Sequence, residues 1–273
     1  MTTFKPLSTL NPYLETIEQS YHDDFITITQ YIQLMEGYKS TAAVTEDYYM
    51  KSANMIPRFI QVDVREGAGI QVNPKLRAGG SYMYGDLDIG LGIKNVVKRV
   101  IANKLVGESI DYPVYYGNGT IVFPPELRHF AIVRLQEDES MVVDSKSIYL
   151  AETSVRINTC KVVNKISAMA LGNKGLVETE LSGPGIVVIA VPCPTTELHE
   201  IELNGNCLYV NGDFAIARFG DIEFRVEPAS SSILASMLSG NELVNSYYGT
   251  GRVWLYHSQP YYKFMDKITG SKQ

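Results

Sequence analysis

The sequence is poor in the residues from which metal sites, disulfide frameworks and membrane spans are built. It has four histidines and three cysteines, Cys160, Cys193 and Cys207, without a CxxC or HExxH spacing, so neither a zinc ribbon nor a disulfide framework is indicated. No apolar run approaches the roughly 18 residues of a membrane-spanning helix, and the first residues lack the apolar centre of a secretory signal. We therefore expect a cytoplasmic protein with no membrane span, no metal and no cofactor.

An excess of positive charge is also missing. The chain carries 24 basic and 30 acidic residues, a formal net charge of -6, which is the wrong sign for a protein whose main partner is a polyanion. One basic cluster, Lys94, Lys98 and Arg99, accompanies an apolar stripe with helical spacing over residues 93–101. Such helices bind lipid headgroups or RNA in some proteins. We interpret this one as a solvated helix face, and we expect nucleic acid not to be a partner.

Catalytic motifs are absent as well. The sequence has no GxSxG nucleophile elbow, and no base or orienting acid is identifiable beside its cysteines. Cys193, between two prolines, is interpreted as a small buried residue in a rigid turn. The acidic run 137–139 is typical of a solvated loop. We therefore expect a protein that is not an enzyme, with no catalytic residues to name.

An internal repeat is present. A Gly-x-Gly followed by an apolar, strand-like run occurs three times, and 66 residues separate each copy from the next. A dinucleotide fingerprint would follow a strand and open a helix, whereas here the glycines follow a helix-like segment and open a strand. We predict that they serve turns or bulges of the backbone. The six glycines are Gly117, Gly119, Gly183, Gly185, Gly249 and Gly251.

The spacing predicts a mostly β body of three tandem units, at 57–128, 129–196 and 197–273, the last including a C-terminal tail. Each unit is expected to hold several strands, a short helix, the Gly-x-Gly turn and a final strand, and together the units form one globular body. Residues 1–56 are expected to be a helical extension. Apolar residues at helical spacing follow Asn11-Pro12, and they predict one helix over residues 11–36 that covers an apolar surface of the β body.

Tyrosine is abundant, with 18 residues. It has high strand propensity and is a common anchor in protein interfaces, because its ring packs while its hydroxyl remains hydrated. Two pairs adjoin the repeated glycines: Tyr115-Tyr116 and Tyr247-Tyr248. We take these four residues as a candidate interface and expect protein partners or self-association. The alternative is a small-molecule binder or enzyme that uses the interior of a β-helix barrel, which would require convergent histidine or carboxylate side chains.

The repeated segments resemble a known family. Gly249-Thr-Gly-Arg-Val-Trp-Leu255, Leu181-Ser-Gly-Pro-Gly-Ile-Val-Val188 and Val106-Gly-Glu-Ser109 are similar to the TRAP-like proteins of the altered-inheritance-of-mitochondria family over residues 57–258. The resemblance implies three short variants of the double-stranded β-helix about a pseudo-threefold axis. The family is named for its likeness to the tryptophan RNA-binding attenuation protein, which makes RNA binding a third alternative by analogy of fold alone. It implies no catalytic residues.

Overall fold

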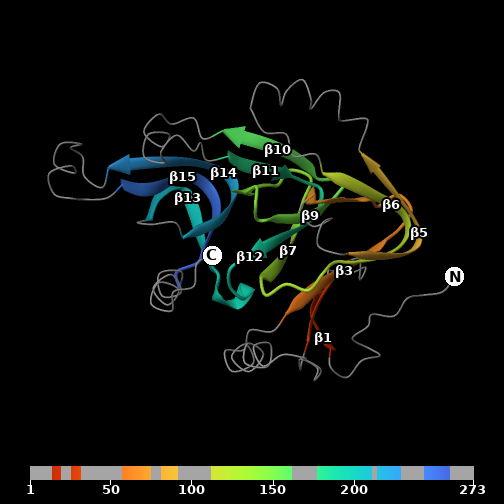
Figure 1. The fold of residues 1–273 in the computed structure, drawn as a ribbon. Coiled ribbons are helices and arrows are strands. Elements are labelled where there is room, and N and C mark those ends of the chain that lie inside the picture. The colour runs from red at the N-terminus through yellow and green to blue at the C-terminus, as the bar shows by residue number, and fades with distance from the viewer. Residues whose placement is uncertain are drawn as a thin grey trace. The chain divides into compact units, whose positions relative to one another are not determined.

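The computed structural model describes residues 14–19, 26–31, 57–74, 81–91, 112–161, 177–210, 214–228 and 243–258. Within these ranges the protein is mostly β, with strands, turns and the short 3₁₀ segment η3 (Thr195–Glu197) (Figure 1). The short helix expected in each of the three repeat units, with apolar residues near 93–101, 162–166 and 233–237, lies outside the described residues. The basic cluster Lys94, Lys98 and Arg99 lies outside them too.

In the part of the chain that the structure describes, fifteen strands form two sheets, and these sheets correspond to two compact units. Unit 1 comprises Met1–Val133, Tyr149–Ser154 and Gly185–Pro192, and unit 2 comprises Arg134–Ile148, Val155–Pro184 and Cys193–Gln273. The sheet of unit 1 contains β1 (Leu14–Gln19), β2 (Ile26–Tyr31), β3 (Arg58–Val64), β4 (Ile70–Val72), β5 (Tyr82–Leu91), β6 (Pro113–Val122), β7 (His129–Leu135), β9 (Ile148–Glu152) and β12 (Gly185–Val191). The sheet of unit 2 contains β8 (Ser140–Asp144), β10 (Arg156–Lys161), β11 (Val177–Ser182), β13 (His199–Val210), β14 (Ala215–Pro228) and β15 (Leu243–Leu255).

Unit 1 is ordered β1-β2-β3-β6-β4-β9-β12-β7, and β5 pairs with β6. Its core is built from β-branched and aromatic residues of these strands, including Ile60, Ile121 and Val188. The ring of Tyr149 makes edge contacts with Phe123 and Phe130, at centroid distances of 5.6 and 4.8 Å. Such residues suit the pleated, buried surface of a sheet, so this composition explains why unit 1 is a sheet with an apolar core.

The helix predicted over residues 11–36 is wrong. Two antiparallel strands occupy this region: β1 pairs with β2, and β2 continues the sheet by pairing with β3. Ile26 and Ile28 are fully buried in the core of unit 1. The alternating run Ile-Thr-Ile-Thr over residues 26–29 is β-branched throughout, and such residues lose rotamer freedom in a helix while packing well on a pleated sheet.

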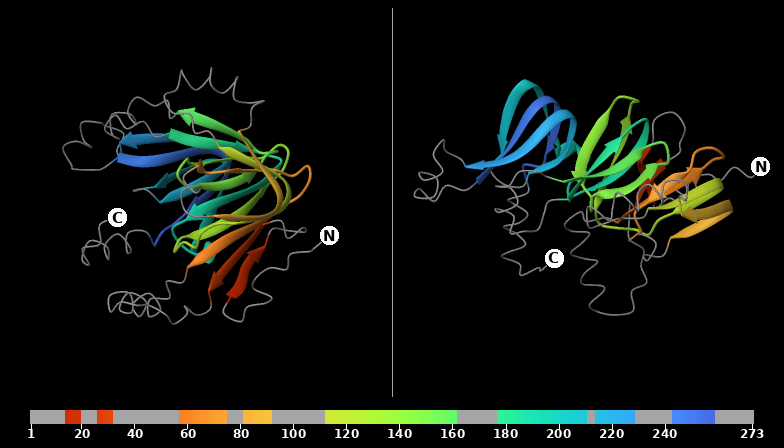
Figure 2. Two further views of the ribbon diagram at one scale, coloured as in Figure 1. Left: turned by 45° about the vertical axis from the view of Figure 1, so that its right-hand side comes forward. Right: turned by 90° about the horizontal axis from the view of Figure 1, so that it is seen from above.

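Unit 2 is ordered β10-β11-β8-β14-β15-β13. In both views of Figure 2 the long strands β13, β14 and β15, coloured teal to blue, lie side by side. Leu203, Ile222, Tyr247 and Val253 belong to the apolar core of these three strands. The β-branched and aromatic residues of the last third of the chain thus bury one another within a single sheet.

A nearly buried ion pair joins two strands that flank β8. Arg218 on β14 donates to both carboxylate oxygens of Glu178 on β11, at 2.6 Å in each bond. The side chains are only 13% and 12% exposed. Parallel two-bond contacts of this kind fix the relative placement of the strands as well as contributing energy.

Two of the Gly-x-Gly segments lie in the middle of long strands. Gly117 in β6 pairs with Leu87 of β5, and Gly249 in β15 pairs with Ile222 of β14. Their φ angles are 113° and 135°, a region that favours glycine. A Cβ at either position would also overlap a main-chain carbonyl oxygen of the facing strand. Glycine is therefore required here by close backbone approach inside a hairpin.

Of the other four repeated glycines, two lie in the same hairpins and two lie at the junction of β11 and β12. Gly119 pairs with Gly85, and Gly251 pairs with Gly220, two residues further along the same hairpins. Gly183 and Gly185 lie where β11 ends and β12 begins. The chain thus crosses from unit 2 to unit 1 between these last two glycines.

Candidate protein-binding surfaces

The two tyrosine pairs each contribute one core residue and one outward-facing residue. Tyr115 is buried in the core of unit 1, and Tyr247 is buried in the core of unit 2. Tyr116 is exposed and Tyr248 is partly exposed. Successive side chains of a strand point to opposite faces of the sheet, so adjacent tyrosines cannot both face a partner. The candidate interface is narrowed to Tyr116 and Tyr248.

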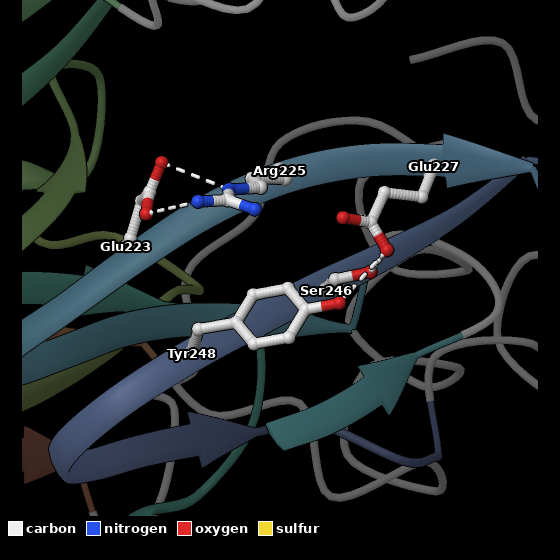
Figure 3. A network of polar contacts seen from close by, with 5 residues as sticks. All are labelled: Glu223, Arg225, Glu227, Ser246 and Tyr248. Atoms are coloured by element: carbon white, nitrogen blue, oxygen red, sulfur yellow. Dashed lines mark hydrogen bonds and ion pairs between the residues drawn. The ribbon is translucent and has the colours of Figure 1, made fainter. Parts of the chain in front are cut away.

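Tyr248 is the centre of a polar network on unit 2. We call it the Tyr248 network and define it as Tyr209, Glu223, Arg225, Glu227, Ser246 and Tyr248. Figure 3 shows these residues except Tyr209. The hydroxyls of Tyr248 and Ser246 both donate to Oε2 of Glu227, at 2.9 and 3.2 Å. The hydroxyl oxygens of Tyr209 and Tyr248 lie 3.3 Å apart. Hydrogen bonds to Tyr209 and Glu227 raise the pKa of Tyr248. The Tyr248 hydroxyl therefore keeps its proton, and its role as a hydrogen-bond donor, to a higher pH than an ordinary tyrosine does.

The charged half of this network borders the tyrosine ring. Arg225 donates from Nε and Nη2 to the two carboxylate oxygens of Glu223, at 2.9 and 2.7 Å. Its guanidinium carbon lies 5.2 Å from the centre of the Tyr248 ring, within cation–π range. The hydrogen bond from Arg225 lowers the pKa of Glu223. A partly exposed aromatic ring beside charges of both signs suits recognition of a protein surface.

Unit 1 exposes apolar side chains along its outer hairpin β5–β6. Met83, Tyr84, Ile89 and Tyr116 are all large and exposed. On unit 2, Tyr209 of β13 is exposed by 60%. Met83, Ile89 and Tyr209 were not among the interface residues predicted from the sequence, which were the tyrosines that adjoin the repeated glycines. The available signal for Tyr209 was its place between Leu208 and Val210, since alternation in a strand sends it to the face opposite its neighbours.

Two histidines that are far apart in the sequence meet in unit 2. The rings of His199, at the start of β13, and His257, just after β15, are in edge contact with centroids 4.4 Å apart. The antiparallel pairing of β13 with β15 brings these ends together. Among the described residues, no three histidine, cysteine, aspartate or glutamate side chains gather in a way that could hold a metal ion.

Cys193 is buried, as predicted. Burial, with a smaller effect of the negative charge of Glu197, raises the pKa of its thiol to about 12. The thiolate is the nucleophilic form of cysteine, so this residue is held in its unreactive form.

His129 of unit 1 is half-buried, and the burial together with the positive charge of Arg58 lowers its pKa to about 4. The folded state therefore binds this proton more weakly than the unfolded state does, whose histidine pKa is near 6.5. We expect the contribution of neutral His129 to stability to be complete above about pH 6.5 and to be lost as the pH falls toward 4. NMR titration of the His129 imidazole checks the pKa, and a midpoint of 6 or above would contradict it. In the His129→Gln variant, the free energy of unfolding should fall less steeply between about pH 6.5 and pH 4 than in the parent protein.

No helix in the described part of the chain is long and apolar enough to cross a membrane.

Comparison with known proteins agrees with the resemblance carried by the glycine segments. Residues 58–257 match the model of the family described as Mitochondrial biogenesis AIM24. A similar solved structure is the crystal structure of a protein from Streptococcus pyogenes, with a TM-score of 0.52 and 15% identity, covering 78% of this chain and 94% of that chain. At this identity the likeness concerns the fold alone. A search of curated proteins finds no match. Because the family model spans most of the sequence, this chain belongs to the Mitochondrial biogenesis AIM24 family.

Proposed function

We propose that this protein is a non-catalytic binding or scaffold protein that self-associates through its β surfaces. The observation that supports this most is the exposure of large apolar side chains on strands at the edge of each sheet. On β5 of unit 1, Met83 and Tyr84 are 44% and 57% exposed, and on β13 of unit 2, Tyr209 is 60% exposed. Exposed apolar residues on a sheet edge favour pairing with another chain.

The chemistry of the Tyr248 network supports the same function. Its groups are the tyrosine hydroxyls, an exposed Arg225–Glu223 pair and a carboxylate, Glu227, that already accepts two hydrogen bonds. These groups suit the polar rim of an interface, where charges set orientation and partner choice more than affinity.

We further propose that residues 57–273 are three tandem repeats related by a pseudo-threefold axis, with boundaries at 57–128, 129–196 and 197–273. The first and third Gly-x-Gly segments support this, because Gly117 and Gly249 occupy the same register in hairpins β5–β6 and β14–β15. Superposing the three segments in an experimental structure tests the symmetry, and a different strand order in any of them would contradict it.

Sedimentation velocity over a range of protein concentrations tests self-association. We expect species heavier than the 30.4 kDa chain that increase with concentration, because exposed edge strands associate by mass action. A single species at the mass of one chain across the whole range would contradict the proposal. Substituting Lys94, Lys98 and Arg99 together serves as the control, and this variant should associate normally if these residues are a solvated face.

A further inference from the structure

Two potential metal ligands converge in unit 2 at His199 and His257. Their ring centroids lie 4.4 Å apart, and the ring planes meet at 67°. Both residues are exposed, so the contact does not fill a gap in the apolar core. Imidazole is the commonest side-chain ligand of metals in proteins. A pair of imidazoles at this distance is therefore a candidate chelating site.

The strand pairing holds the two histidines in place before any ion binds. His199 lies opposite Leu255 in the β13–β15 ladder, and His257 follows two residues after Leu255. The hydroxyl of Ser258 donates to Oε2 of Glu197 at 3.0 Å, and Glu197 is the second residue before His199. The main chain is thus tied on both sides of the pair. Binding an ion orders little more than the two rings, which favours affinity.

The distance between the rings suits one shared ion. A metal ion about 2.0–2.1 Å from one nitrogen of each ring, with a square or tetrahedral angle between the two bonds, places the ring centroids about 4.5–5.2 Å apart. The observed 4.4 Å is close to the lower end of that range. Small rotations about the side-chain bonds of the two exposed residues open this distance and turn one nitrogen of each ring toward the ion.

We propose that His199 and His257 jointly bind one divalent transition-metal ion. Zinc, nickel and copper are metals that imidazole suits. Among the described residues, no group of three or more histidine, cysteine, aspartate or glutamate side chains could hold a metal ion, so we assign the remaining coordination positions to water. Two protein ligands, in place of the four of a structural zinc site, make the ion exchangeable. This site goes beyond the binding or scaffold function proposed above.

The charges around the pair favour a cation. Residues 193–204, which include His199, contain three glutamates and no lysine or arginine. The carboxylate of Glu197 accepts its hydrogen bond from the neutral hydroxyl of Ser258, so it brings a negative charge to the end of the sheet at which His257 lies. A carboxylate near the site attracts a cation without ligating it.

The ion would join the start of β13 to the residues that follow β15. Folding of unit 2 brings the two histidines together from distant positions in the sequence, so the unfolded chain offers no such pair. A ligand that binds the folded state and not the unfolded state stabilises the fold by mass action. We therefore expect zinc or nickel alone to raise the melting temperature, with a rise that follows occupancy of the site.

Isothermal titration calorimetry with nickel or zinc chloride, on protein first treated with a chelator and then freed of it, measures the site. We expect one ion per chain. His199→Gln and His257→Gln should each weaken binding by about tenfold or more, because each removes one of the two ligands. The matched control is His129→Gln, which removes the half-buried histidine of unit 1 and should bind like the parent. In chelator, the His199 and His257 variants should melt near the parent, since both residues are exposed.

NMR of the unaltered protein provides a readout that needs no substitution. Paramagnetic Cu²⁺, added below one equivalent, should first broaden the signals of His199, His257 and their neighbours. The proposal is overturned by an absence of binding, by binding that survives either substitution, or by broadening that begins elsewhere. Sedimentation velocity in the presence of a chelator tests self-association separately, so the proposed function can fail or hold independently of this site.

Discussion

Replacing Gly249 by alanine is expected to lower the free energy of unfolding by about 3 kcal/mol, a large effect for one methyl group. The new Cβ would overlap the carbonyl oxygen of Asp221 on the facing strand. The alanine would also have to adopt a φ of 135°, which residues with a side chain rarely do. Denaturation in urea, monitored by circular dichroism, measures the change.

The control is Gly205→Ala in the same unit. Gly205 has a φ of 74°, but a Cβ there would meet no atom within 4 Å. This variant therefore carries only the backbone cost of the left-handed conformation, about 1 kcal/mol. Equal losses in the two variants would contradict the importance of close strand approach at Gly249.

Replacing Arg218 by alanine should lower the free energy of unfolding by about 3 kcal/mol or more, because it leaves the carboxylate of Glu178 buried without its partner. The double variant Arg218→Met with Glu178→Leu should recover most of this loss, since it removes both charges and keeps apolar volume. Urea denaturation of both single variants and the double variant completes a double-mutant cycle.

The exposed pair Arg225–Glu223 provides the comparison. It is also a two-bond contact, made from Nε and Nη2 of Arg225, but its side chains are solvent-exposed, so Arg225→Ala should leave stability within error of the parent. Additive losses of unfolding free energy for the Arg218 and Glu178 variants would show that the two side chains do not stabilise each other. Equal losses for Arg218→Ala and Arg225→Ala would show that burial does not decide the value of an ion pair.

The sequence predicted the mostly β class and the family, because glycines that must lie close to a facing carbonyl recur at a fixed spacing in the sequence. The N-terminal strands were not predicted. Apolar residues such as Ile17, Phe25 and Ile28 happen to recur at helical spacing, and this outweighed the local β-branched run over residues 26–29. The partner that decides the outcome is β3, which pairs with β2, and no local window of sequence contains it.

Two of the four tyrosines chosen from the sequence, Tyr116 and Tyr248, face outward in the structure. The tyrosine pairs were recognised, but which member faces outward depends on the phase of the strand in the sheet. Tyr209 and Glu227 were not predicted, since only the order β14-β15-β13 brings them beside Tyr248. The contact of His199 with His257 was missed for the same reason. Such sites depend on strand order, which leaves no motif of fixed spacing.

The alternation of the two units along the chain governs how the protein can be made. Unit 1 needs the segments Tyr149–Ser154 and Gly185–Pro192, which are separated by parts of unit 2. During synthesis, unit 1 therefore cannot be completed before Pro192 has left the ribosome, and the two units cannot fold one after the other as independent domains. Pairings between strands so distant in sequence, such as β4 with β9, form slowly. Until then an incomplete chain exposes apolar strands that lack their partners, which is the condition under which chains associate wrongly.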